Sequence, residues 1–136
     1  MENYFNLSDL EFENQFANCT LNPELFSHEA HLRLAWIHIT KYGIDKAEEN
    51  IQTQLKNFVQ FVGASDKYNK TLTIVAIKAV NHFILQSKSN HFNNFIIEFP
   101  QLKTAFKPLI NSHYSIDIFN SEKAKTEFIK PDVSPF

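Results

Sequence analysis

Two histidines, His28 and His31, stand three positions apart in the stretch FSHEAHLRLAW. Residues at i and i+3 of a helix lie on one face, so both imidazoles can reach one ligand or one metal ion. Imidazole also exchanges protons near neutral pH, which suits acid and base chemistry. His38 lies ten residues after His28, about 15 Å along a helix axis, and cannot join the same site. An alternative stays open, in which both histidines are structural and bond to neighbours or water.

A metal site needs a third and a fourth ligand. The carboxylates nearest in sequence are Glu24, Glu29 and Asp66, and spacing forces none of them to face the histidines. Glycine-rich phosphate loops, GxSxG and HExxH are missing from the sequence, since HEAH is one residue too short for the last pattern. The single cysteine, Cys19, excludes a four-thiolate zinc site and is expected to be a buried, inert thiol.

Two long helices are predicted around the histidines. The first spans residues 27–42, with Ser27 as its N-cap, because apolar side chains recur there at helical spacing. The second spans residues 44–62 and is amphipathic. At its start, Asp45 and Glu48 have the spacing of a capping box, in which each side chain satisfies a backbone N–H group.

Two glycines are predicted to end these helices. Gly43 and Gly63 each follow an apolar periodic segment and suit the left-handed conformation that closes a helix C-terminus. A third long helix is expected from Asn69 or Lys70 to Gln86. It is apolar on most sides, so we expect it to be central.

Shorter elements are expected at both ends of the chain. A short helix should precede the long ones, and Pro23 suits a separate turn of helix in NPEL. Pro100 should halt a later helix, Pro108 should kink or end another, and a last one can start at Asn120 or Ser121. We expect two or three C-terminal helices, followed by an extended KPDVSPF segment.

Composition favours one all-α domain over residues 1–136, a helical bundle. Fourteen phenylalanines against two glycines suit long helices with short turns and do not suit an all-β chain. The net charge of −2, with lysines spread along the chain, argues against nucleic acid as a partner. No apolar run spans a bilayer and no signal peptide is recognisable, so we expect a soluble, cytoplasmic protein without a membrane partner.

Chain topology predicts where the histidines lie. Short turns make consecutive helices antiparallel, so the three long helices should run up, down and up. The helix start that carries His28 and His31 should then meet residues 66–73 at one end of the bundle. Three polar side chains of that segment can orient a ligand there, or can cap the third helix: Tyr68, Asn69 and Thr71.

The sequence also resembles a bacterial family of small, largely uncharacterised proteins with the motifs FxHxxHLxLAW, YHxTxT and SxxARxxFxxPD. The first motif stands here as Phe26, His28, His31, Leu32, Leu34, Ala35 and Trp36. The second stands as Tyr68, Asn69, Thr71 and Thr73, and the third as Ser121, Ala124, Lys125, Phe128, Pro131 and Asp132. The resemblance covers nearly the whole chain and implies that the first two motifs belong to one site.

One position departs from the family pattern, because Asn69 stands where the second motif has a histidine. An amide is a poor transition-metal ligand beside imidazole. Two readings follow from the resemblance. Either the family's metal or acid–base site is weakened or lost in this protein, or the motifs build a hydrogen-bonded polar site in which asparagine can replace histidine.

Two hypotheses about function come from these observations. The first is a small-ligand or metal-assisted site with His28 and His31 as ligands or proton carriers and with Tyr68, Asn69 and Thr71 orienting the ligand. The cofactor would be a divalent metal, zinc or iron, held by His28 and His31. The second is a non-catalytic helical protein whose exposed aromatic side chains bind a partner or a second copy of the chain, which would make a homo-oligomer.

Overall fold

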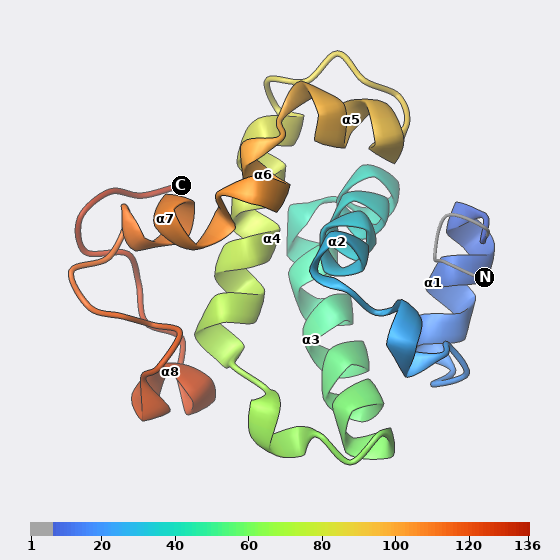
Figure 1. Ribbon diagram of the computed structural model, residues 1–136, viewed down its shortest axis with the longest axis horizontal. Helices are drawn as coiled ribbons and strands as arrows, with labels where there is room; N and C mark the ends of the chain where they lie inside the picture. Colours follow the sequence, from blue (N-terminus) through green and yellow to red (C-terminus); the bar gives the residue numbers. More distant parts are fainter. Residues whose placement is uncertain (1–6) are drawn as a thin grey trace. The chain divides into compact units, whose positions relative to one another are not determined.

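Helices make up the regular structure of this chain. The computed structural model describes residues 7–136 and contains no strand in that range (Figure 1), which confirms the all-α prediction. The chain divides into two compact units, one that ends at Tyr68 and one from Asn69 to Phe136, called unit 1 and unit 2 below. Within residues 7–136, no helix is both long enough and apolar enough to cross a membrane.

Unit 1 is built on three α-helices. Its elements are α1 (Asp9–Ala17), η2 (Pro23–Leu25), α2 (His28–Tyr42), α3 (Ile44–Phe61) and η3 (Ser65–Lys67). The helices α2 and α3 pack side by side and α1, the shortest of the three, packs on both of them (Figure 1). The predicted long helices at 27–42 and 44–62 and the short turn at Pro23 are therefore confirmed to within one residue at each end.

The helix ends of unit 1 follow the sequence except at one position. Ser27 caps α2 by accepting a hydrogen bond from the Ala30 N–H group, as predicted. Gly43 and Gly63 have φ of +88° and +75°, so both predicted positive-φ glycines are confirmed. The predicted capping role of Asp45 is wrong, because Gly43 makes the whole turn between α2 and α3 and no side chain caps α3. Asp45 therefore falls inside the first helical turn, past the capping position.

A cluster of three phenylalanines joins the elements of unit 1. Phe16 of α1, Phe58 of α3 and Phe26, which precedes α2, have ring centroids 4.9 to 5.3 Å apart. Aromatic pairs at such distances contribute about 0.5–1.5 kcal/mol beyond the area they bury. This phenylalanine cluster fixes the segment that leads into α2.

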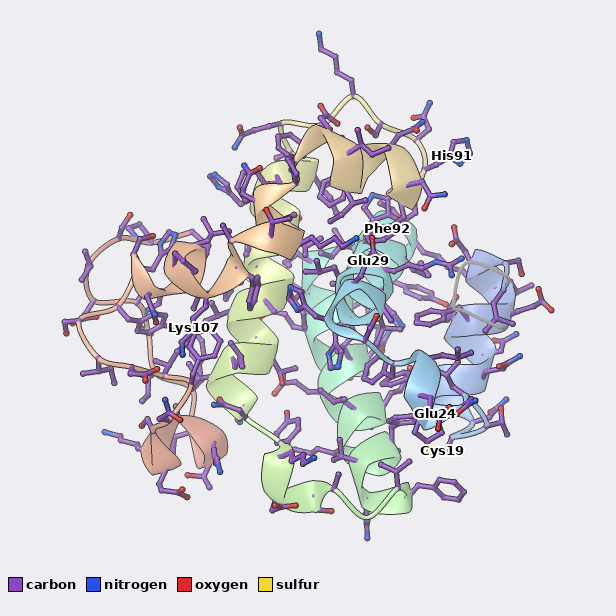
Figure 2. The ribbon with its side chains drawn as sticks, viewed as in Figure 1. Cys19, Glu24, Glu29, His91, Phe92 and Lys107 are labelled. Atoms are coloured by element: carbon purple, nitrogen blue, oxygen red, sulfur yellow. The ribbon has the colours of Figure 1, made fainter. Side chains whose placement is uncertain are left out.

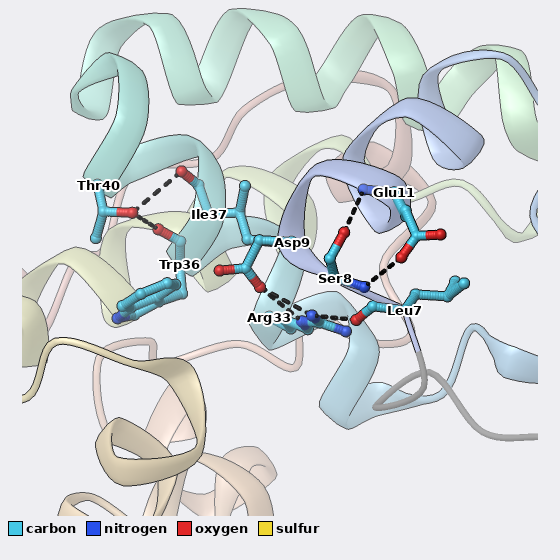
Figure 3. A network of polar contacts seen from close by, with 8 residues as sticks. All are labelled: Leu7, Ser8, Asp9, Glu11, Arg33, Trp36, Ile37 and Thr40. Carbon is cyan, nitrogen blue, oxygen red and sulfur yellow. Dashed lines mark hydrogen bonds and ion pairs between the residues drawn. The ribbon is translucent and has the colours of Figure 1, made fainter.

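Two ion pairs hold α1 against α2. The buried Arg33 guanidinium donates from Nη2 to Asp9 Oδ1 at 2.8 Å and to the Leu7 carbonyl at 2.8 Å (Figure 3). The buried carboxylate of Glu13 accepts hydrogen bonds from Lys41 Nζ at 2.8 Å and from the Tyr42 hydroxyl. Both acidic residues belong to α1, so its packing depends on charged groups.

The end of α1 has an unusual backbone. Cys19, two residues beyond the helix, has a φ of +59°, in the left-handed region. It is the one residue other than glycine with positive φ in the part of the chain that the structure describes. The turn is closed by hydrogen bonds from the Thr20 and Leu21 N–H groups to the Gln15 carbonyl, at 2.8 and 3.1 Å. Cys19 thus reverses the chain after α1.

Unit 2 begins with the third long helix. Its elements are α4 (Lys70–Ile84), α5 (Phe92–Glu98), α6 (Gln101–Thr104), α7 (Phe106–Asn111) and α8 (Glu122–Thr126). The helices α7 and α8 contact α4, and Phe99, just after α5, contacts Phe83 of α4 with ring centroids 5.0 Å apart. The α4 helix is therefore the central element of this unit (Figure 1).

Four helices follow α4 in unit 2, α5 to α8, where two or three were expected. Ala105 separates α6 from α7. Pro108 lies in the first turn of α7, where backbone N–H groups have no partner within the helix, so the missing N–H group of proline costs no hydrogen bond. Ser121, one of the two predicted start positions, caps α8 through the Ala124 N–H group. Residues 127–136 contain no regular element, in agreement with the expected extended segment.

Candidate functional site

The two predicted histidines lie in the first turn of α2. His28 is the first helical residue and the His31 N–H group bonds to the Ser27 carbonyl at 3.0 Å. Both side chains are exposed. Further along the same helix Ala35 and His38 are buried, so the face that carries the histidines is accessible at the start of α2 and covered in its middle. That turn is where a ligand can reach two imidazoles.

Phe26 fixes the orientation of His31. The imidazole stacks on the Phe26 ring with centroids 3.8 Å apart and planes inclined by 26°. Phe26 in turn belongs to the phenylalanine cluster with Phe16 and Phe58. One face of His31 is therefore held by the core of unit 1, while the side chain stays exposed elsewhere.

The environment of His31 keeps its imidazole neutral. Desolvation by the surrounding protein and repulsion from His28 lower the pKa of His31 to about 4. The exposed surface of the side chain acts against this shift, since solvent contact favours the charged form. Anywhere between about 4 and the ordinary value near 6.5 the ring is mostly uncharged at neutral pH. His31 is thus ready to accept a hydrogen bond or to bind a metal ion.

Acidic side chains do not complete a metal site around this pair. Within residues 7–136, no three His, Cys, Asp or Glu side chains are grouped so that they could share a metal ion. Figure 2 shows Glu24 on η2 well separated from Glu29 on α2, although both are close to His28 in sequence. A metal ion at His28 and His31 would keep open positions for water or for a ligand.

Tyr68 is the last residue of unit 1. Its side chain is half-buried, and the Lys56 ammonium lies 5.4 Å from the centroid of its ring. The predicted meeting of His28 and His31 with the 66–73 segment stays a prediction.

Asn69 and Thr71 make hydrogen bonds inside unit 2. Asn69 is the N-cap of α4, where its Oδ1 accepts from the Leu72 N–H group at 2.9 Å. Its Nδ2 donates to the Ile118 carbonyl at 2.9 Å. The Thr71 hydroxyl donates to the Glu127 carbonyl at 2.7 Å and accepts from the Ile129 N–H group at 3.0 Å.

These bonds give the start of α4 a structural role. Asn69 and Thr71 are both buried, and apart from Leu72 their partners lie 49 to 58 positions further along the chain. Glu127 and Ile129 flank Phe128, a residue of the third motif. The second and third motifs are therefore connected by hydrogen bonds within unit 2. In the sequence, the only sign of this contact was that both motifs occur in one chain.

Sequence reasoning missed a second group of buried polar side chains, in unit 1. Glu13 and Arg33 are buried, as is His38, and each lies on the α1 or α2 helix. No spacing rule singles out Glu13, because it is one of several acidic residues near the N-terminus. Its burial depends on how α1 packs against Lys41 and Tyr42 of α2.

Comparisons with protein-family models, with curated proteins and with solved structures found no match to this chain.

Proposed function

We propose that the first turn of α2 is a binding site for a small polar ligand, in which His28 and His31 are the ligand-contacting groups. The observation that carries this proposal is the exposed, neutral imidazole of His31, which is held in place by stacking on Phe26. A preoriented neutral imidazole can accept a hydrogen bond without losing side-chain freedom on binding.

A divalent metal ion, zinc or iron, fits the same pair in a limited way. His28 and His31 would provide two nitrogen ligands, and water or the bound ligand would provide the remaining ones. The lowered pKa of His31 helps, because a metal ion then competes with few protons for the ring nitrogen. We propose that such a metal is exchangeable, and that it assists ligand binding rather than holding the fold together.

The remaining predicted residues take different parts in this proposal. Tyr68 stays a candidate for orienting the ligand. Asn69 and Thr71 were also predicted to orient it, but their side chains already bond to backbone groups of unit 2. We therefore assign them to the fold and leave the ligand contacts to His28 and His31. A cytoplasmic location is part of the proposal, because a chain with one cysteine needs no oxidising compartment.

Titration with zinc and cobalt tests the metal form of the proposal. Calorimetry should show one Zn²⁺ per chain, and bound Co²⁺ should give a visible spectrum that changes when imidazole is added. The His28→Ala, His31→Ala double variant should lose this binding, whereas a His82→Ala, His91→Ala double variant, which removes two exposed histidines of unit 2, should keep it. Equal binding by both double variants would exclude the metal form.

Histidine resonances test the ligand form. Acetate and inorganic phosphate, added as probes in metal-free buffer, should shift the ring signals of His28 and His31 and leave those of His82 and His91 unchanged. If all four histidines respond equally, the probes bind without selectivity and the proposed site has no support.

A second candidate function is an interaction surface on unit 2. Leu85, after α4, is 78% exposed and Ile97 of α5 is 75% exposed. The Glu98 carboxylate accepts hydrogen bonds from the hydroxyls of Ser87 and Ser89 at 2.6 and 2.7 Å, which fastens the end of α4 to α5. Two exposed apolar side chains thus flank one rigid connection.

Such a surface is suited to a partner protein or to a second copy of the chain. Sedimentation velocity over a range of concentrations tests self-association. A Leu85→Ser, Ile97→Ser double variant should then remain monomeric at concentrations where the wild type dimerises, and Leu10→Ser in unit 1 should behave as the wild type. If the wild type is monomeric at all concentrations, this surface does not bind a second copy of the chain.

A further inference from the structure

His38 of α2 is a buried histidine that lacks a full set of hydrogen bonds. Its side chain has no exposed surface. The ring Nδ1 lies 3.5 Å from the Asn50 amide nitrogen of α3. The Nε2 atom is also buried and has no hydrogen-bond partner within residues 7–136. Because the Asn50 amide nitrogen is a donor, Nδ1 is the acceptor and the neutral ring carries its one proton on Nε2. A second proton on Nδ1 would face that donor, and the buried cation would have no acceptor for either N–H group.

Titratable groups face His38 from two helices. On α1, the Glu13 carboxylate favours the protonated ring, but it is already bonded to Lys41 and Tyr42. On α2, the Lys41 ammonium disfavours the protonated ring, and the Tyr42 ring lies 5.4 Å from that of His38. The contact from α3 is the amide of Asn50, which does not titrate.

The balance of these effects keeps His38 neutral. Burial acts most strongly and lowers the pKa of His38, attraction to Glu13 raises it, and repulsion from Lys41 lowers it again, so the net shift is downward from 6.5. The unfolded chain therefore binds a proton at His38 more readily than the folded chain does. The neutral His38 therefore makes its full contribution to stability above pH 6.5. This contribution is lost as the pH falls below 6.5 toward the lower pKa that His38 has in the folded chain.

Among the three α-helices of unit 1 that the structure describes, α1 can detach from its neighbours most easily. It has nine residues, against fifteen in α2 and eighteen in α3. It is held by Phe12 and Phe16 in the core and by the ion pairs of Asp9 and Glu13. Glu13 of α1 holds the Tyr42 hydroxyl, and the Tyr42 ring lies 5.4 Å from that of His38, so movement of α1 would loosen a group that packs against the buried ring.

We propose that His38 is an acid-sensitive switch for the packing of α1 on α2 and α3. With His38 neutral, α1 is docked and Phe12 and Phe16 are covered. Protonation of His38 places a cation in the buried site, where Nε2 has no acceptor, and α1 is released so that the imidazolium is hydrated. The released state exposes the aromatic face of α1.

Native-state hydrogen exchange between pH 7.5 and 5 tests the switch, after division by the intrinsic exchange rates. The opening constant of α1 amides should rise by up to tenfold for each pH unit below 6.5, because the open state binds one proton more than the closed state. Amides of α4 in unit 2 should not show this rise. An equal rise in both units, or none in α1, would overturn the proposal.

Two variants assign the effect to His38. In His38→Gln the rise should disappear, because the amide does not titrate in this range. In His31→Gln, which removes the other histidine with a lowered pKa, the rise should persist. If the rise persists in His38→Gln and disappears in His31→Gln, the titrating group is His31 and not His38.

A direct titration keeps the proposal testable if His38→Gln does not fold. The ring signals of His38 in the wild type, followed by NMR, should titrate below 6.5, and the change should coincide with the loss of α1 protection. A His38 that titrates at 6.5 or above while α1 stays protected would contradict the proposal.

Discussion

The two units hold their outer segments in different ways. In unit 1, α1 is attached to α2 by ion pairs, Asp9 with Arg33 and Glu13 with Lys41. In unit 2, the C-terminal segment is attached to α4 by neutral side chains that bond to buried or half-buried backbone groups. Ion pairs respond to pH and salt, whereas neutral hydrogen bonds respond to neither over the physiological range. We therefore expect unit 1 to be the part of the chain that senses solution conditions.

The largest effect is expected at Asn69 in unit 2. In Asn69→Leu, the Leu72 N–H group loses its cap and the Ile118 carbonyl loses its donor. Each unsatisfied buried group costs about 1–3 kcal/mol, so we expect a loss of roughly 3 kcal/mol in urea unfolding. Asn94→Leu, on the exposed face of α5, is the matched control and should change stability by less than about 0.5 kcal/mol. A similar small change for both variants would show that neutral hydrogen bonds do not hold unit 2.

Thr71→Val should have the next largest effect. Valine has nearly the shape of threonine but lacks the hydroxyl that bonds to the Glu127 carbonyl and to the Ile129 N–H group. We expect a loss of about 2 kcal/mol that is the same at 50 mM and 500 mM salt. Thr126→Val, at an exposed position of α8, serves as the control. A marked salt dependence for Thr71→Val would remove the contrast between the units.

Glu13→Gln tests the ionic side of the comparison. Burial raises the pKa of Glu13, but hydrogen bonds from Lys41 and Tyr42 lower it by more, so the net shift is downward from 4.5. The carboxylate therefore stabilises unit 1 above pH 4.5, and this contribution is lost as the pH falls through the folded pKa. We expect the variant to lose about 1 kcal/mol at pH 7, and the difference from the wild type to shrink toward pH 3.

Glu49→Gln is the control for this measurement. Glu49 pairs with Lys46 at 3.5 Å on the exposed surface of α3, where an ion pair contributes little. If both glutamate variants lose the same stability, burial of the Glu13 carboxylate is of no consequence for the attachment of α1.

The smallest expected effect concerns the candidate site. Repulsion from His28 contributes to the lowered pKa of His31, although desolvation contributes more. His28→Ala should therefore raise the pKa of His31 slightly, which NMR titration of the ring can follow. Replacing the stacked ring in Phe26→Leu should raise it further, because the imidazole becomes better hydrated. A fall in the pKa of His31 in either variant would mean that the cause of the shift has been misassigned.

The sequence predicted the long helices because their boundaries depend on local rules. Ser27 caps α2 through a residue three positions away, and Gly43 turns the chain by its own backbone. The error at Asp45 arose from the same local reasoning, because Asp45 and Glu48 have the spacing of a capping box although the helix already begins directly after Gly43. Boundaries are predictable where one local signal acts alone.

The candidate site could be predicted only in part. The spacing of His28 and His31 was sufficient to place both in one helical turn. The stacking of His31 on Phe26, which connects to Phe58 on another helix, depends on tertiary packing that spacing does not encode. The same is true of Thr71, whose partners lie more than fifty positions away. Long-range partners therefore decide which polar residues stay free for a ligand.

The reversal of the chain at Cys19 makes the docking of α1 observable without engineering. Cys19 is the only cysteine of the sequence, it is partly accessible, and it stands two residues after α1. A maleimide fluorophore would therefore attach at one defined point of the native chain. The same thiol, left unlabelled, would act as a kinetic reporter, because its rate of reaction measures how often the turn after α1 opens.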